Sequence, residues 1–149
     1  MKHLLTLFIS CFFLLTASAQ GFKISSFHAD IQLSKEGKIE VTENIDVFFT
    51  EQKRGIFRDI PYKFKNTGKK YTTDISNITV VGHPFKVSKK NGMKSIRIGD
   101  PDIYLTGNQK YTIRYTVEGP FLSSPEYCEF YWNVTGNDWQ ATIEKASFA

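Results

Sequence analysis

Cysteine and histidine are scarce in this sequence. The 149-residue chain contains two cysteines and three histidines, and Cys11 lies in an apolar N-terminal segment that we expect to be removed. Cys128 then has no internal partner, so no disulfide can form in the domain. An exported domain of this kind depends on its hydrophobic core, and the supply of Phe, Tyr, Ile and Val is adequate for one. Because Cys128 precedes an aromatic segment, we expect a small buried thiol.

The sequence also lacks a hydrophobic run long enough to cross a bilayer. The run Leu4–Leu15 is shorter than the about 20 residues that a transmembrane helix needs. It follows a lysine and precedes Ala17-Ser18-Ala19, an order typical of a secretory signal peptide. We therefore interpret residues 1–19 as a cleaved signal peptide and residues 20–149 as one mature domain. A lipoprotein signal that uses Cys11 is the alternative, although a small-residue cleavage site follows that cysteine.

Groups that support catalysis or metal binding are sparse as well. The sequence contains no nucleophile elbow, no glycine-rich phosphate loop and no zinc-ligand cluster. His28 lies on a polar strand face and His83 in a Gly-His-Pro turn, so we assign both to the surface. Asp100 and Asp102 form a simple turn in our interpretation, because calcium takes roughly six to eight oxygen ligands. We expect no enzyme activity, no metal and no cofactor.

The chain is mildly basic, with a formal charge of +4. Its lysines gather near turns or along strand faces that we expect to be solvated, in two groups: Lys63, Lys65, Lys69 and Lys70, then Lys86, Lys89, Lys90 and Lys94. Outside a cell such a surface could meet anionic lipid or anionic wall polymer, or simply be an ordinary soluble surface. The export signal and the lack of a recognisable nucleic-acid module disfavour nucleic acid as a partner.

Most of the mature sequence alternates between apolar and polar residues, which predicts half-buried strands. Phe27, Ala29, Ile31 and Leu33 share one face, and a turn at Glu36-Gly37 leads to a second strand with Ile39, Val41, Ile45, Val47 and Phe49 on its apolar face. We predict further strands at Ile75–Val81, Phe85–Ser88, Lys94–Ile98, Lys110–Val117, Glu129–Val134 and Gln140–Phe148. Many short strands separated by turns predict an all-β fold, an antiparallel immunoglobulin-like or fibronectin-III-like β-sandwich.

The positions of Tyr111, Tyr131 and Trp132 add detail to this prediction. Leu105, Gly107 and Tyr111 have the spacing of the corner in immunoglobulin-like sandwiches, where the tyrosine hydroxyl bonds to upstream backbone. The alternative is a plain strand with Tyr111, Ile113, Tyr115 and Val117 inward. Further along, Trp132 is expected in the core, whereas Tyr131 is the better candidate for an exposed contact. We expect these large side chains to be buried: Ile31, Val41, Val47, Ile113, Tyr115 and Trp132.

Glu43 falls on the apolar face of its strand. A carboxylate there is costly unless it is paired, because its lost hydration must be compensated. The nearest suitable partners are Arg54 and Arg58, and we expect Arg58 to form a partly buried contact that pins the segment Arg54–Pro61 against the sandwich. The alternative is a bulge or strand end that turns Glu43 to solvent.

Five segments of the mature chain occur in an order that resembles a known family. They are Gly37-Lys-Ile39-Glu-Val41-Thr-Glu43, Arg54-Gly-Ile56-Phe-Arg58-Asp59-Ile60-Pro61, Ile98-Gly-Asp100, Tyr111-Thr-Ile113-Arg-Tyr115 and Glu129-Phe-Tyr-Trp132-Asn133-Val-Thr-Gly136-Asn-Asp-Trp139. Together they resemble the predicted bacterial membrane proteins of domain of unknown function 2207 (DUF2207). The resemblance implies an exported β-rich domain followed by transmembrane segments, with no established biochemical function.

These arguments give a set of residues with expected structural or interaction roles. They are Glu43, Arg54, Arg58, Asp59, Tyr111, Tyr131, Trp132, Asn133 and Trp139. The chain ends at Ala149 inside a segment that we interpret as a strand, with no apolar span after it. We favour a fragment of a longer membrane protein over a short secreted relative, because a terminal strand leaves an edge without its partner.

We therefore expect a non-catalytic, extracytoplasmic domain of a membrane-anchored bacterial envelope protein, an interaction or structural module. Its partner would be an envelope protein or a wall polymer, and the membrane would be reached through a downstream segment. The main alternative is a secreted carbohydrate- or wall-polymer-binding module that uses Tyr131 and the lysine surfaces.

Overall fold

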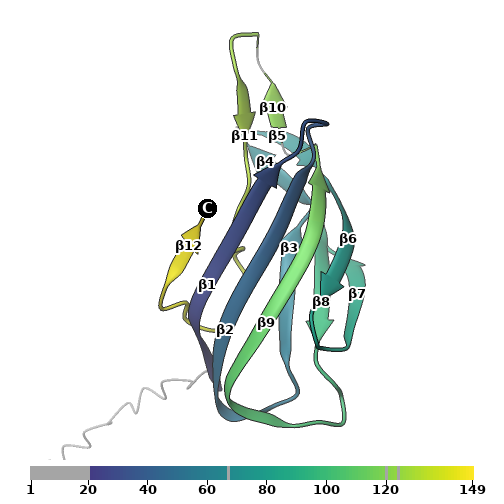
Figure 1. Ribbon diagram of the computed structural model, residues 1–149. Helices are drawn as coiled ribbons and strands as arrows, with labels where there is room; N and C mark the ends of the chain where they lie inside the picture. The colour runs from purple at the N-terminus through teal and green to yellow at the C-terminus, as the bar shows by residue number, and fades with distance from the viewer. Residues whose placement is uncertain (1–20, 67, 120, 124) are drawn as a thin grey trace, which may run out of the picture.

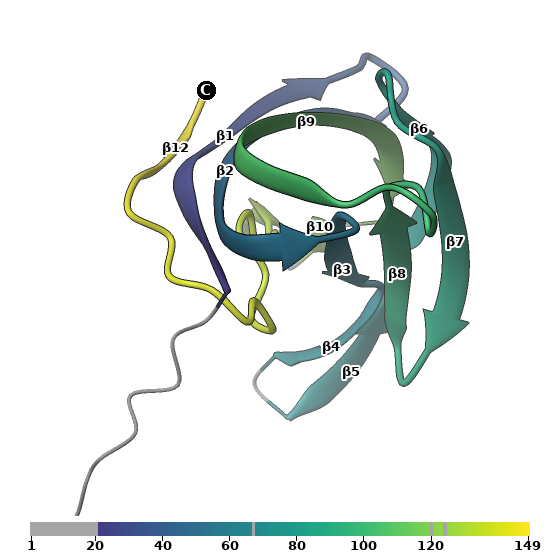
Figure 2. The ribbon, with the colours of Figure 1, turned by 90° about the horizontal axis from the view of Figure 1, so that it is seen from below.

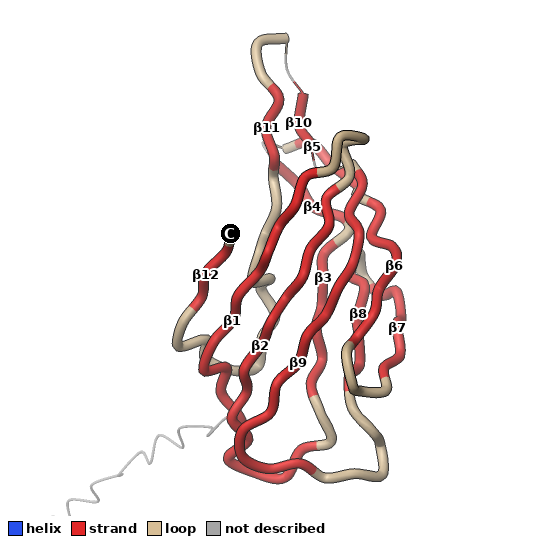
Figure 3. Tube along the Cα trace, viewed as in Figure 1, coloured by secondary structure: helices blue, strands red, loops and turns tan. Residues whose placement is uncertain are grey.

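A computed structural model describes residues 21–149 except 67, 120 and 124. All regular structure in these residues is β-strand, as Figure 3 shows, so the predicted all-β class is confirmed. The described part contains no helix that is long and apolar enough to cross a membrane. The signal peptide predicted for residues 1–19, together with Cys11, lies outside the described residues.

Five strands form the larger sheet, in the order β12-β1-β2-β9-β6 (Figure 1). The three in the middle are long: β1 (Phe22–Leu33), β2 (Ile39–Lys53) and β9 (Leu105–Glu118). β6 (Asp74–Val80) and the short β12 (Ala146–Phe148) are the edges. Neighbouring strands are antiparallel except β1 and β12, which are parallel. The predicted hairpin between β1 and β2 is confirmed.

A smaller sheet packs against this one and completes the sandwich. It contains β3 (Ile56–Pro61), β8 (Met93–Ile98) and β7 (Phe85–Lys90), antiparallel and in that order. Figure 2, seen from below, shows β3 and β8 facing the curved β2 and β9. Isoleucines from the inner face of the small sheet join residues of the large sheet in one hydrophobic core: Ile56, Ile60, Ile96 and Ile98 with Ile45, Val47, Tyr111 and Ile113.

Two short hairpins project from the same end of the sandwich (Figure 1). One is formed by β4 (Lys63–Asn66) and β5 (Lys69–Thr72), the other by β10 (Phe121–Ser123) and β11 (Cys128–Phe130). The sequence pattern did not predict β3, β4, β5 or β10. Cys128 is exposed on its hairpin, so the prediction of a buried thiol was wrong.

Four of the six predicted core residues are buried, namely Val41, Val47, Ile113 and Tyr115. Ile31 and Trp132 are only partly buried and pack against the core, so their predicted full burial was wrong. Ile31 lies beside the edge strand β12 and lines a shallow recess with Leu33 and Phe148. Trp132 lies outside any strand, in a loop.

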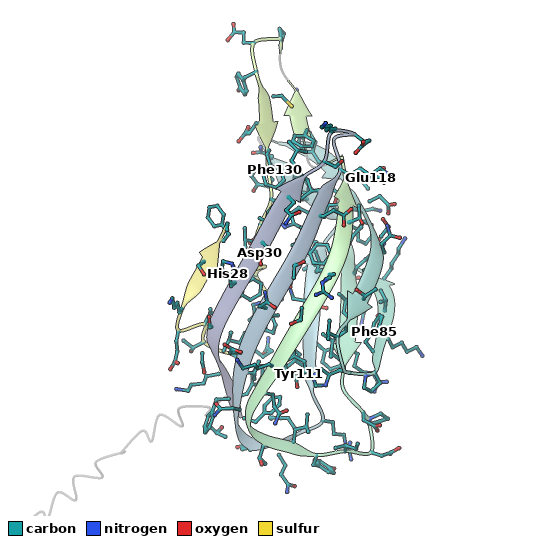
Figure 4. All side chains as sticks on the ribbon, in the orientation of Figure 1. His28, Asp30, Phe85, Tyr111, Glu118 and Phe130 are labelled. Atoms are coloured by element: carbon teal, nitrogen blue, oxygen red, sulfur yellow. The ribbon has the colours of Figure 1, made fainter. Side chains whose placement is uncertain are left out.

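The strands predicted at Glu129–Val134 and Gln140–Phe148 are much shorter in the structure. Only Cys128–Phe130 and Ala146–Phe148 are strands, with one further bridge between Ile24 and Ile143. Between these strands, the carbonyl groups of Val134 and Thr135 bond to a buried side chain, described below. β12 is also held by His28, whose Nδ1 lies 2.8 Å from Ser147 Oγ. Figure 4 shows His28 and Asp30 on β1 beside β12.

Tyr111 does not form the predicted corner. Its side chain is fully buried, and its hydroxyl has no hydrogen-bond partner among the described residues. The ring packs beside His83, with 4.8 Å between ring centroids. The plain-strand alternative is correct, since Tyr111, Ile113, Tyr115 and Val117 are all buried. Burial raises the pKa of Tyr111 to about 12.

We expect Tyr111→Phe to stabilise the domain by about 1 kcal/mol, because the substitution removes a buried hydroxyl that makes no hydrogen bond. Urea denaturation at neutral pH measures the change. A loss of stability at neutral pH would show that the hydroxyl has a partner.

The raised pKa provides a second readout of the same variant. The pKa of Tyr111 is about 12 in the folded protein, whereas an unfolded tyrosine titrates near about 10. The folded state therefore binds more protons in this window, and stability falls as pH rises through it. The Phe variant should lose less stability than the parent protein over the same range.

Candidate functional site

Glu43 lies in the centre of the large sheet and points into the sandwich. β2 is regular at this point, with Glu43 opposite Ala29 on β1 and opposite Ile113 on β9. Its side chain is 0% exposed. The alternative in which a bulge turns Glu43 to solvent is therefore wrong, and the carboxylate needs partners inside the protein.

Arg58 on β3 supplies the main partner, as predicted. Its Nε donates to Glu43 Oε2 and its Nη2 to Glu43 Oε1, both at 2.7 Å, which is the paired geometry of an arginine and a carboxylate. Tyr115 on β9 donates its hydroxyl to Glu43 Oε1 at 2.6 Å. Arg58 is 1% exposed, so the contact joins the two sheets through the core.

The remaining donors of Arg58 bind backbone carbonyl groups. Nη1 donates to Asp59 O at 2.9 Å and to Thr135 O at 3.1 Å, and Nη2 donates to Val134 O at 3.0 Å. With the two bonds to Glu43, all five N–H groups of the guanidinium are used. Its Cζ also lies 5.4 Å from the centroid of the Phe27 ring, a cation–π contact. We call Glu43, Arg58 and Tyr115 the clamp.

A loop of residues 132–139, which we call the capping loop, covers the clamp. Trp139 donates its Nε1 to Thr135 O at 2.8 Å, and its ring centroid lies 5.8 Å from Arg58 Cζ. Asn133 accepts from the Gly136 amide at 3.0 Å and donates to Asn137 Oδ1 at 2.7 Å. These bonds fix the two carbonyl groups that Arg58 binds, so Asn133 and Trp139 act through the loop.

The electrostatics of the clamp keep Arg58 and Tyr115 each in one protonation state. Burial by itself would lower the pKa of Arg58, but the Glu43 carboxylate outweighs it and raises the pKa above its usual value. Burial, and then the charge of Glu43, raise the pKa of Tyr115 well above its usual value. Arg58 is therefore a fixed cation and Tyr115 a fixed hydrogen-bond donor, which is the chemistry of a structural contact.

The opposite face of β3 forms the floor of an open cleft of about 1170 Å³. Strand alternation turns Phe57 and Asp59 outward because Arg58 points inward. At one end the backbones of Gly55 and Gly99 lie against each other. A Cβ added to Gly55 would lie 3.0 Å from Gly99 Cα and 1.9 Å from Ile98 O. The cleft is lined in part by Arg54, Phe57, Asp59, Arg97, Tyr104 and Trp139.

The structure thus brings most of the residues singled out in the sequence to two adjoining places. Glu43 and Arg58 form the clamp, and Trp139 lies between clamp and cleft. Arg54 does not reach Glu43. It is exposed, donates to the Tyr104 hydroxyl and lies 4.5 Å from the centroid of that ring.

Trp132, at the start of the capping loop, packs beside Tyr115 of the clamp, at 6.3 Å between ring centroids. The other two singled-out residues have different surroundings. Tyr131 is 38% exposed, yet its ring stacks on Phe64 at 5.1 Å between ring centroids, so one of its faces is already in contact. Tyr111 lies in the core, apart from the clamp.

Two buried polar positions were not recognised by the sequence prediction. Tyr115 was expected only as a core residue, although it shares the inner face with Glu43 on the neighbouring strand. Lys94 was grouped with solvated lysines, which was wrong. It is 8% exposed, donates to Ile75 O and lies 3.8 Å from Asp74 Oδ1. Its alternation with Ile96 and Ile98 was the available signal.

The described residues contain no group of three or more side chains suited to hold a metal ion. Asp100 and Asp102 form the predicted turn, since Asp100 Oδ1 accepts from the Asp102 amide at 2.8 Å.

Comparison with known proteins gives one family match. The sequence profile described as predicted membrane protein (DUF2207) N-terminal domain matches residues 23–149. No curated protein matches the chain.

Solved structures show only distant likeness. Leukotriene A4 hydrolase from Saccharomyces cerevisiae has 11% identity and a TM-score of 0.44, with 66% of this chain and 15% of that chain covered. An M1 zinc metallopeptidase from Deinococcus radiodurans has 12% identity and a TM-score of 0.41, with 72% and 22% covered. The chain therefore spans less than a quarter of these proteins, and likeness at this level carries no information on activity.

We expect Glu43→Gln to lower the free energy of unfolding by about 3–5 kcal/mol, because it leaves the Arg58 charge buried without a counter-charge. A double-mutant cycle with Arg58→Met should show a coupling energy of about 2–3 kcal/mol in urea denaturation. Glu118→Gln is the matched control, since Glu118 lies 2.7 Å from Lys38 in an exposed pair that should contribute less than about 1 kcal/mol. Additive effects in the cycle would contradict the clamp.

We expect Gly136→Ala to destabilise the domain by more than about 2 kcal/mol. Gly136 has φ +80°, and an added Cβ would lie 2.5 Å from Arg58 Nη1, an atom held by two carbonyl groups. Gly37→Ala is the control, because Gly37 has φ +74° with nothing within 4 Å of the added Cβ. That variant should show only the backbone strain, about 1 kcal/mol. Equal losses in thermal unfolding would show that Arg58 yields freely.

Proposed function

Because this chain belongs to the family of DUF2207 predicted membrane protein N-terminal domains, we propose that it is the extracytoplasmic domain of a membrane-anchored bacterial envelope protein. It acts by binding a ligand or partner in the cleft on the outer face of β3 and β8, and it performs no chemistry. The segment order at the N-terminus, basic, apolar and then small, supports export.

The observation that carries this proposal is the saturation of the clamp. The charged groups of the family-like motifs, Glu43 and Arg58, are bonded to each other, to Tyr115 and to backbone. Neither is available to a substrate, so the motif serves to hold β3 and the capping loop in place. The solvent-facing side of β3 is the cleft floor. A fixed floor with outward polar and aromatic side chains suits ligand recognition.

A second candidate function is a secreted wall-polymer-binding module that uses a different surface. The rings of Tyr71, Phe64 and Tyr131 stack in series, with centroid distances of 5.5 and 5.1 Å. The β4–β5 hairpin also carries exposed lysines: Lys63, Lys65, Lys69 and Lys70. Binding of a wall polymer that is lost in Tyr131→Ala and kept in cleft variants would favour this candidate.

We expect alkaline phosphatase fused after Ala149 to be active in bacterial cells that produce the chain with its N-terminal segment, since the enzyme matures outside the cytoplasm. Removal of residues 1–19 should abolish that activity, and mass spectrometry of the exported protein should place its N-terminus at Gln20. An inactive fusion that is made in normal amounts would contradict an extracytoplasmic domain. Turnover of wall material by the purified protein would contradict the non-catalytic role.

A further inference from the structure

We propose that the cleft binds an acidic oligosaccharide, a chain of sugar rings that carry carboxylate groups. This inference rests on the proposed binding role and names the ligand class for the same site. Four features of the cleft support it: an excess of cations, exposed aromatic rings, neutral hydrogen-bonding side chains, and length.

Cations exceed anions along the cleft. Its lining includes Arg54, Lys90 and Arg97 against two carboxylates, Asp59 and Asp138, apart from Arg58, which is paired with Glu43, and Lys53, which lies 3.6 Å from Glu51. Within the described part of the chain, neither Arg97 nor Lys90 has a carboxylate oxygen within 4.0 Å. Arg97 is therefore free to form a two-bond contact with a ligand carboxylate. This charge balance selects an anionic ligand.

Exposed aromatic rings border the same surface, and they favour a sugar ligand over a simple inorganic anion. Phe57 is 61% exposed and lies opposite Arg97 in the β3–β8 ladder. Tyr104 is 54% exposed, and its ring is positioned by Arg54. Exposed apolar area next to a cation suits the apolar C–H face of a sugar ring whose carboxylate reaches the arginine, whereas a small inorganic anion leaves that area uncovered.

Neutral polar side chains offer both donors and acceptors to hydroxyl groups. Gln52, Asn91 and Gln140 line the cleft, and side-chain amides can bond hydroxyls in either sense. A hydroxyl-rich ligand, which both donates and accepts hydrogen bonds, matches these side chains.

The size of the cleft fits an oligomer. Its volume of about 1170 Å³ exceeds the range of about 300–1000 Å³ typical of small-molecule pockets. The floor follows β8 from Met93 to Ile98, six residues, which at about 3.3 Å per residue is about 20 Å. The cleft is therefore long enough for several sugar rings in a row.

The test is calorimetric titration of the protein without residues 1–19. The probes are three uronate hexasaccharides: oligogalacturonate, oligomannuronate and hyaluronan. Chitohexaose presents sugar rings without the carboxylates, and hexa-aspartate presents carboxylates without sugar rings. We expect at least one uronate to bind at least about tenfold more tightly than both comparison ligands, with an affinity that falls as salt rises.

Two exposed cleft residues provide the variants. Arg97→Gln and Phe57→Ala should each weaken uronate binding at least about tenfold, with thermal unfolding unchanged because both side chains are exposed. Lys35→Gln is the matched control, since Lys35 is an exposed lysine in the turn before β2 that does not line the cleft. It should leave the affinity within about twofold.

Each other outcome is decisive. The ligand class is wrong if no uronate binds at about 1 mM, or if both cleft variants bind as well as the parent protein. Equal binding of hexa-aspartate, lost in Arg97→Gln, also overturns the sugar while keeping the cleft as the binding site. Cleavage of a hexasaccharide supports the ligand class and instead overturns the non-catalytic function.

Discussion

The buried contact between Arg58 and Glu43 is the constraint on which the rest of this structure depends. Taking both charges out of water is expensive, and their attraction repays it only when every remaining donor is also satisfied. Arg58 meets that condition by binding Glu43, Asp59 O, Val134 O and Thr135 O. The chain after β11 therefore binds Arg58 through its carbonyl groups and does not extend a sheet. Gly136 lies where this chain passes the guanidinium, and a side chain there would clash with Arg58 Nη1.

The same contact decides what faces solvent on the small sheet. Side chains alternate along a strand, so an inward Arg58 commits Phe57 and Asp59 to the outer face. The interior partner thus fixes the orientation of the exposed floor, and the family-like segments meet around one feature although they are far apart in sequence. One face of β3 therefore packs in the core through Arg58, and its other face carries the exposed side chains of the cleft floor.

Period-two patterning was sufficient for the long strands of the large sheet, because their inward positions are almost all apolar. The pattern failed where a charge occupies an inward position. β3 was missed since Arg58 interrupts its apolar face, and Lys94 was placed at the surface for the same reason. Glu43 was the exception. A carboxylate among the apolar residues of a regularly alternating strand needs a partner, and this requirement predicted the contact with Arg58. The capping loop was not predicted because Trp132 and Val134 alternate as in a strand, whereas the carbonyl group of Val134 binds the distant Arg58.

The parallel edge between β1 and β12 has a consequence for the order of folding. Phe27 on the first strand pairs with Ala146 on the last, and the side chains of His28 and Ser147 meet across a sequence separation of 119 residues. Closing so long a loop costs conformational entropy before the contacts can stabilise the fold, so we expect β12 to pair with β1 late in folding. Because the chain is synthesised from its N-terminus, one edge of β1 stays unpaired until β12 has been made.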